Sequence, residues 1–139
     1  MSAPLYIRVP HGGELPAVEG QQPFQAVVIA ETPCSPGWQA LVSQWLVRSG
    51  CLYMMAWGPE CSSWDDSVDV ANLEEFGYGE IPDDRFVMTT WHESEPVQEV
   101  FWFSKHSAHH PAMPLRSTVL LHISEQDKER EFLSLYAEA

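Results

Sequence analysis

Four apolar runs along the chain alternate with segments of helical periodicity. The runs occupy residues 24–30, 51–57, 85–91 and 117–123. Short runs that are apolar throughout, or rich in β-branched and aromatic residues, are typical of strands covered on both faces, as in a parallel sheet. A shorter run at 5–9 stops at Pro10 and predicts a strand that lies at a sheet edge or loosely on the surface.

Between the runs, apolar side chains recur at helical spacing. The clearest stripe, at i, i+3, i+4, i+7 and i+8, consists of Trp38, Leu41, Val42, Trp45 and Leu46. It predicts an amphipathic helix that ends at Gly50. The next three helices are predicted from residues that favour a helix start. Ser62 or Ser63 is the expected N-cap of the first, Pro96 the first residue of the second, and Ser124 the N-cap of the third.

This repeated strand-then-helix plan predicts an α/β fold with three layers. We expect a mostly parallel sheet of four to five strands with helices on both faces, as in flavodoxin-like or Rossmann-like architectures. The chain shows no internal repeat, low-complexity stretch or linker, so we expect a single domain over residues 1–139. Residues 1–23 would form an N-terminal strand and loop, and 24–139 the core. The strand order does not follow from the pattern.

The charge of the chain is one-sided, with 20 acidic residues against 7 Lys and Arg and a formal net charge of −13. We therefore expect neither nucleic acid nor a membrane surface as a partner, because both are bound largely through Lys and Arg. The same charge favours solubility and speeds the encounter with a basic protein.

Three features predict a cytoplasmic protein. The odd count of three cysteines does not fit a disulfide framework. Residues 1–4 show no signal-peptide pattern, and no apolar run approaches the length of a membrane span.

Ligands of open α/β sheets bind beyond the carboxyl ends of the strands. The residues that follow the predicted strands are therefore the candidate site residues. The candidate acid–base groups are Glu31, Glu60, His92 and Glu93, and the candidate ligand contacts are Trp57, Trp91, Cys34 and Cys61. Two carboxyl groups in one site, one neutral and one charged, would suit acid–base catalysis and would require one raised pKa. Carboxylates in such positions are also stabilised by helix N-termini without any catalytic role.

The cysteines suggest two further chemistries. Cys34, Cys61 and His92 with Glu93 have the atoms for a zinc site, and a cysteine at a helix N-terminus with His92 as base would be a nucleophile. Neither CxxC nor HExxH spacing is present, so we predict no metal site and expect the cysteines to act as small apolar residues.

The remaining histidines have ordinary explanations. His106, His109 and His110 stand at i, i+3 and i+4 near a predicted helix end, where histidine commonly hydrogen-bonds to the free carbonyl groups of the last turn. His122 lies within a strand and is expected to be a hydrogen-bonded core residue. The GxGxxG, GxxxxGK[ST] and GxSxG patterns are all missing, so we predict no cofactor.

Four segments of the chain resemble a small bacterial family with no assigned function. They are WGPEC at 57–61, WDDSVD at 64–69, FVMTTWHE at 86–93 and EVFWF at 99–103. The resemblance covers about residues 51–103. It implies a bacterial source and a free-standing small protein, and it carries no catalytic residue.

Two functions from different classes remain. The first is a non-enzymatic, acidic protein-binding module, a monomer or small homo-oligomer comparable to immunity proteins, adaptors and regulators. The charge, the missing motifs and a surplus of tryptophan favour it, because tryptophan is a frequent interface anchor. The surplus residues are Trp57, Trp64, Trp91 and Trp102. The alternative is a small enzyme or ligand-binding domain with a pocket between Glu31, Trp57 and His92.

Overall fold

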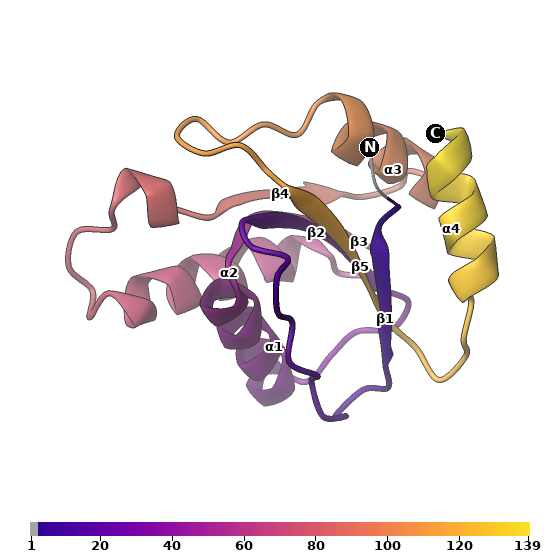
Figure 1. Ribbon diagram of the computed structural model, residues 1–139. Helices are drawn as coiled ribbons and strands as arrows, with labels where there is room; N and C mark the ends of the chain where they lie inside the picture. Colours follow the sequence, from indigo (N-terminus) through magenta and orange to yellow (C-terminus); the bar gives the residue numbers. More distant parts are fainter. Residues whose placement is uncertain (1–2) are drawn as a thin grey trace.

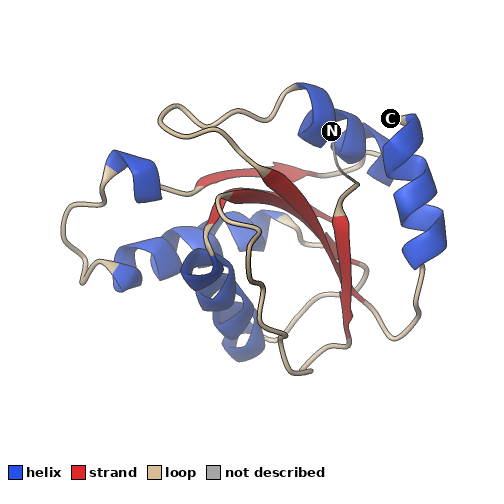
Figure 2. Cartoon of the chain, viewed as in Figure 1, coloured by secondary structure: helices blue, strands red, loops and turns tan. Residues whose placement is uncertain are grey.

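The computed structural model describes residues 3–139, where strands and helices alternate along most of the chain (Figures 1 and 2). The elements are β1 (Leu5–Val9), β2 (Phe24–Ala30), α1 (Pro36–Ser49), β3 (Cys51–Trp57), α2 (Ser62–Glu75), the short 3₁₀ helix η1 (Asp83–Arg85), β4 (Met88–His92), α3 (Val97–His106), β5 (Ser117–Ile123) and α4 (Glu129–Glu138). No helix of the described residues is long and apolar enough to cross a membrane.

The strands form one parallel sheet in the order β1-β5-β2-β3-β4. The chain first moves outward from β2 to β3 and β4, and α1 and α2 cover one face on the way. Helix α3 then carries it back across the opposite face, so that β5 enters between β1 and β2. The predicted three-layer α/β fold is confirmed, and β1 lies at an edge of the sheet (Figure 1).

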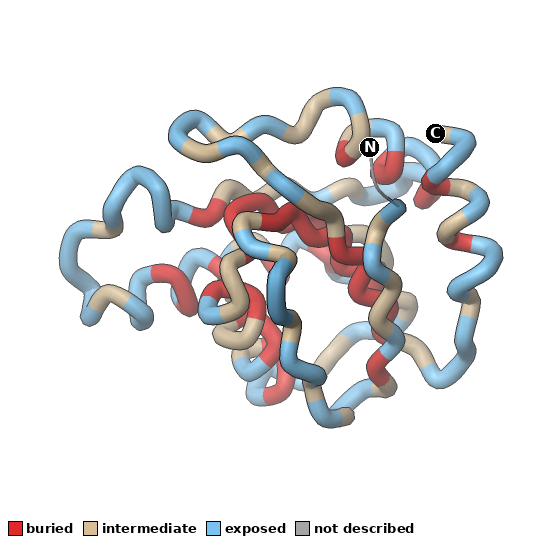
Figure 3. Tube along the Cα trace, viewed as in Figure 1, coloured by how far each residue is buried: buried red, intermediate tan, exposed pale blue. Residues whose placement is uncertain are grey.

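The core lies on both faces of the three central strands (Figure 3). Every residue of β2 is buried, and its side chains alternate between the two layers. Ala26 and Val28 pack toward α1 and α2, whereas Val27 and Ile29 pack toward α3 and α4. This two-sided burial explains why the strand is apolar throughout instead of alternating with polar residues.

The third predicted strand begins three residues too early. Arg85 belongs to η1, and β4 starts only at Met88. The physical reason is Asn72 of α2, whose amide nitrogen donates to the Arg85 carbonyl at 3.2 Å and whose amide oxygen accepts from the Val87 N–H at 2.9 Å. A side chain of α2 therefore binds these backbone groups, and the ladder with β3 begins only after them.

Two predicted helix starts also need correction. Helix α4 begins at Glu129 and not after Ser124, because Ser124 accepts from the Gln126 N–H in a turn and Asp127 accepts from the Glu129 N–H. In helix α2 the N-cap is Cys61 and not Ser62 or Ser63, and it makes no side-chain hydrogen bond.

Candidate functional site

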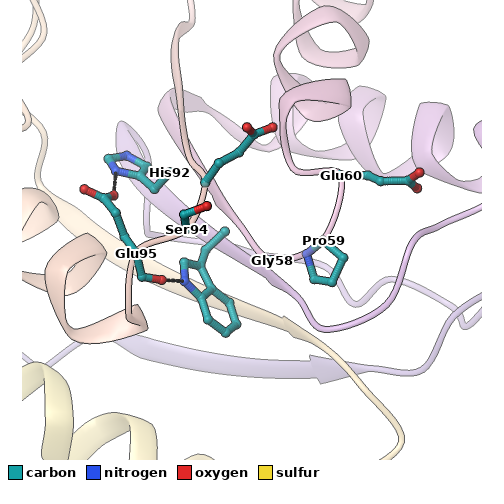
Figure 4. A pocket seen from close by; sticks show the side chains of 8 residues that line it. Gly58, Pro59, Glu60, His92, Ser94 and Glu95 are labelled. Carbon is teal, nitrogen blue, oxygen red and sulfur yellow. Dashed lines mark hydrogen bonds and ion pairs between the residues drawn. The ribbon is translucent and has the colours of Figure 1, made fainter.

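The carboxyl ends of β3 and β4 border an open depression of about 410 Å³. Two short segments line it, namely residues 57–60 at the end of β3 and residues 92–95 at the end of β4 (Figure 4). Three of the four predicted acid–base residues are therefore at this depression. The fourth, Glu31, is not among the lining residues.

His92 is held firmly at the wall of this depression. Its Nδ1 is 2.9 Å from a carboxylate oxygen of Glu95, and its Nε2 is 2.9 Å from the hydroxyl oxygen of Thr90. Its ring packs edge-on against Phe103, with centroids 5.0 Å apart, and only 10% of the side chain is exposed. Both ring nitrogens are thus engaged within the protein, so His92 presents no free nitrogen to a substrate or metal.

Both loops of the depression contain a non-glycine residue in the left-handed backbone region. Glu60 has φ 57° and Ser94 has φ 60°. Such a conformation costs roughly 1–2 kcal/mol per residue, and it persists where surrounding contacts fix the backbone. One such contact is the Trp57 indole N–H, which donates to the Glu95 carbonyl at 2.7 Å and joins the two loops. Their shape is therefore defined by contacts across the depression.

The depression is strongly acidic. Its ionisable lining residues are Glu60, His92, Glu93 and Glu95, with no Lys or Arg among the lining residues. In Figure 4 the carboxylate of Glu60 points away from His92 and Glu95. The acidic groups therefore surround the opening without converging on one reacting atom.

Glu31 belongs to a second polar cluster, at the carboxyl ends of β2 and β5. Its carboxylate is 2.6 Å from Nε2 of His122 and 3.1 Å from Nζ of Lys128. Nδ1 of His122 is 2.7 Å from the Tyr6 hydroxyl, which accepts from the Lys128 backbone N–H at 3.0 Å. Helices α1 and α4 leave these two adjacent strands on opposite faces, so the cluster marks the point where the strand order reverses.

The hydrogen bonds of this cluster fix the tautomer of His122. The Tyr6 oxygen accepts from Lys128, so its only hydrogen is directed at Nδ1 of His122. The neutral imidazole then carries its proton on Nε2 and donates it to Glu31. The four residues form a closed ring that joins β1, β2, β5 and the start of α4.

The titration of this cluster does not suit an acid catalyst. Burial opposes ionisation of Glu31, but hydrogen bonds from His122 and Lys128 outweigh it and lower the pKa of this carboxyl. For His122, burial lowers the pKa of the imidazole by more than the hydrogen bond to Glu31 raises it. At neutral pH the pair is a charged carboxylate beside a neutral imidazole, whereas the enzyme hypothesis requires a carboxyl with a raised pKa.

The candidate cysteines lie beneath the surface or apart from the depression. Cys61 is fully buried at the start of α2, and Cys34 is half-buried in the turn after β2. Burial raises the pKa of both thiols, so neither is a ready thiolate nucleophile. Within residues 3–139 no three His, Cys, Asp or Glu side chains are grouped as metal ligands would be.

The tryptophans divide between core and surface. Trp64 is buried and Trp57 is half-buried, whereas Trp91 is 47% and Trp102 is 51% exposed. Trp91 lies on β4, at the edge of the sheet and one residue from His92. Trp102 lies on α3 and stacks against His106, with centroids 5.0 Å apart.

Sequence reasoning missed the partners that define both clusters. Tyr6 lies 116 residues before its partner His122, and Lys128 lies 97 residues after its partner Glu31, so no local pattern connects them. Glu95 follows His92 by three residues, and that spacing was the one available signal. The predicted core role of His122 is confirmed, since the side chain is fully buried and hydrogen-bonded.

Comparison with known proteins assigns a family but no activity. A family model described as "Domain of unknown function (DUF7684)" matches residues 4–139, which includes every strand and helix described above. Neither the curated proteins nor the solved structures contain a match to the chain.

Proposed function

The chain belongs to the DUF7684 family, and we propose that it is a non-enzymatic protein-binding module that binds a basic partner at the carboxyl ends of β3 and β4. The observation that carries this function is the depression lined by Glu60, Glu93 and Glu95 without a lysine or arginine. Basic side chains of a partner would pair with these carboxylates, and the net charge of −13 would speed the encounter.

The acidic surface continues along the first half of α2, beside β4. Thr89 of β4 donates its hydroxyl to Asp65, and Asp69 lies one turn further along the helix. Burial, with the negative charges of Asp65 and Asp66, raises the pKa of Asp69. Three aspartates on this half of α2 concentrate negative charge beside β4, and a cationic partner would relieve their mutual repulsion.

Trp91 would supply the apolar anchor of such an interface. It is 47% exposed, it precedes His92 of the depression, and it lies on the same face of β4 as Thr89, which contacts Asp65 of α2. Aromatic side chains at the centre of an interface often contribute much of its binding energy, and an indole ring also attracts cations over its face.

Catalysis at the same place has less support. Both nitrogens of His92 are hydrogen-bonded, Glu31 is ion-paired elsewhere, and the pKa values of the Cys34 and Cys61 thiols are raised by burial. The free thiols fit a reducing compartment. Together with the resemblance described above, they support a role in the bacterial cytoplasm.

A peptide of about ten residues that alternates arginine with valine is a suitable probe of this surface. We expect the double variant E60Q/E93Q to bind it roughly fivefold to tenfold more weakly than the unaltered chain at low salt. Raising the salt from about 20 to about 300 mM should reduce this difference, because screening weakens exposed ion pairs. Fluorescence anisotropy on the full chain measures both effects.

The matched control is E14Q/E19Q, which removes two exposed carboxylates from the loop before β2. The double variants E60Q/E93Q and E14Q/E19Q change the net charge equally. Binding through the depression predicts less than about a twofold loss in this control. Equal losses in the two double variants would mean that the peptide responds to net charge alone, and the proposed function would be wrong.

A further inference from the structure

We propose that the basic partner adds an extended strand to the open edge of β4, with basic and apolar side chains in alternation. The sheet order leaves β4 paired with β3 alone. Within residues 3–139, no backbone segment beyond the sheet forms a backbone hydrogen bond with residues 88–92. The outward N–H and C=O groups of β4 are therefore a template for another strand.

The two edges of the sheet differ in their protection. Strand β1 carries Arg8, whose guanidinium donates to the Ser124 carbonyl, and it lies between Pro4 and Pro10. Charged side chains and prolines are the usual means by which an edge strand avoids pairing with another chain. The β4 sequence MTTWH contains neither lysine, arginine, acid nor proline. This edge is thus the one of the two that is suited to pairing.

The two faces beside β4 define the side-chain pattern of the partner. Thr89 and Trp91 point to the face of α2, where Asp65 and Asp69 lie. Met88 and His92 point to the opposite face, toward Phe103 and the apolar cluster beneath α3. An added strand would therefore place alternate basic side chains beside the aspartates and Trp91, and its other side chains beside Met88.

Charge also decides between a partner and a second copy of the chain. Pairing of β4 with β4 of another copy would bring two sets of Asp65, Asp69 and Glu93 together. Like charges at close range across paired strands are destabilising. A basic segment relieves the same repulsion, so it is the occupant that the surface favours.

This inference rests on the proposed function, so the experiment must distinguish failure of strand addition from failure of binding at the acidic site. The arginine–valine peptide is compared with two twins, one N-methylated at every arginine and one at every valine. Each twin lacks the N–H donors along one edge of the peptide and keeps all side chains. Strand addition predicts that one twin binds at least tenfold more weakly and the other about as well as the parent peptide. It also predicts that the parent peptide slows exchange of the outward-pointing amides of Met88–His92 at least tenfold.

Tryptophan variants supply a matched pair on the protein side. W91A is expected to weaken binding at least threefold, and W102A is expected to leave it unchanged, although both side chains are about half exposed. Unchanged amide exchange in β4, with both twins binding as the parent does, would overturn strand addition and leave the acidic site intact. Failure of all three peptides to bind at low salt would overturn the proposed function itself. A dimer that protects β4 without peptide would show that a second copy is the occupant.

Discussion

The imidazole of His122 is fully buried and hydrogen-bonded through both nitrogens, to Tyr6 and Glu31. Its neutral form is the stable one in the folded chain, because burial lowers the pKa of His122 below its usual 6.5. The partner carboxylate of Glu31 stays ionised through the same bonds. His122 thus joins the edge strand β1 to the sheet through Tyr6, and its two partners Tyr6 and Glu31 hold Lys128 at the start of α4.

This arrangement predicts a loss of stability in acid. Below about pH 6.5 the unfolded chain takes up a proton at His122 that the folded chain resists, so the free energy of unfolding falls as the pH falls. Below about 4.5 it falls further, since the lowered pKa of Glu31 makes the unfolded chain the stronger base there too. H122Q should be less stable by about 2 kcal/mol at neutral pH and should lose the first part of this pH dependence.

Urea unfolding at several pH values between about 7 and 5 measures the effect. H109Q is the control, since His109 is exposed and should leave the slope unchanged. A variant H122Q that retains the pH dependence of the unaltered chain would contradict this account of His122.

At the scale of elements, the end of β3 is fixed by its close approach to β2. Gly58 has φ 118°, and a Cβ built there would lie 1.8 Å from the Ala30 carbonyl oxygen. Two backbones therefore meet where the first loop of the depression begins, and only glycine leaves the necessary space. The geometry of Trp57 and Glu60 depends on this contact.

G58A is consequently expected to lower the free energy of unfolding by about 3–5 kcal/mol, from strain at positive φ together with the steric clash. G77A is the matched control, because its φ is also positive, at 61°, but no atom lies within 4 Å of the added Cβ. We expect it to cost about 1 kcal/mol. Equal losses, measured by chemical denaturation, would show that backbone conformation and not the contact with Ala30 matters.

The elements themselves could largely be predicted from the sequence, because periodicity and burial determine them. The buried strand β2 and the stripe of α1 are both local patterns. The start of β4 was not predictable in the same way. It depends on Asn72, a side chain of α2 that binds backbone groups of Arg85 and Val87. Such a contact exists only once the helix has packed beside the strand.

At the scale of the whole molecule, strand order separates the predicted site residues. Neighbouring strands lie roughly 5 Å apart, so the ends of β2 and β4, two strands apart, differ by roughly 10 Å. Glu31 therefore lies beyond hydrogen-bonding reach of His92, but it lies next to His122 because β5 is adjacent to β2. The sequence pattern predicts that these residues lie at the carboxyl ends of the strands. Only the strand order shows which of them meet.

The acidic depression, the exposed Trp91 and the unguarded edge of β4 adjoin one another on one side of the molecule. We propose that a basic partner binds there. An NMR titration of the full chain with the arginine–valine peptide at low salt tests this binding. We predict that the shift changes gather on residues 57–60 and 88–95 and on the Trp91 indole. Changes that gather instead on the acidic helix α4, or that scatter over the whole surface, would contradict the claim.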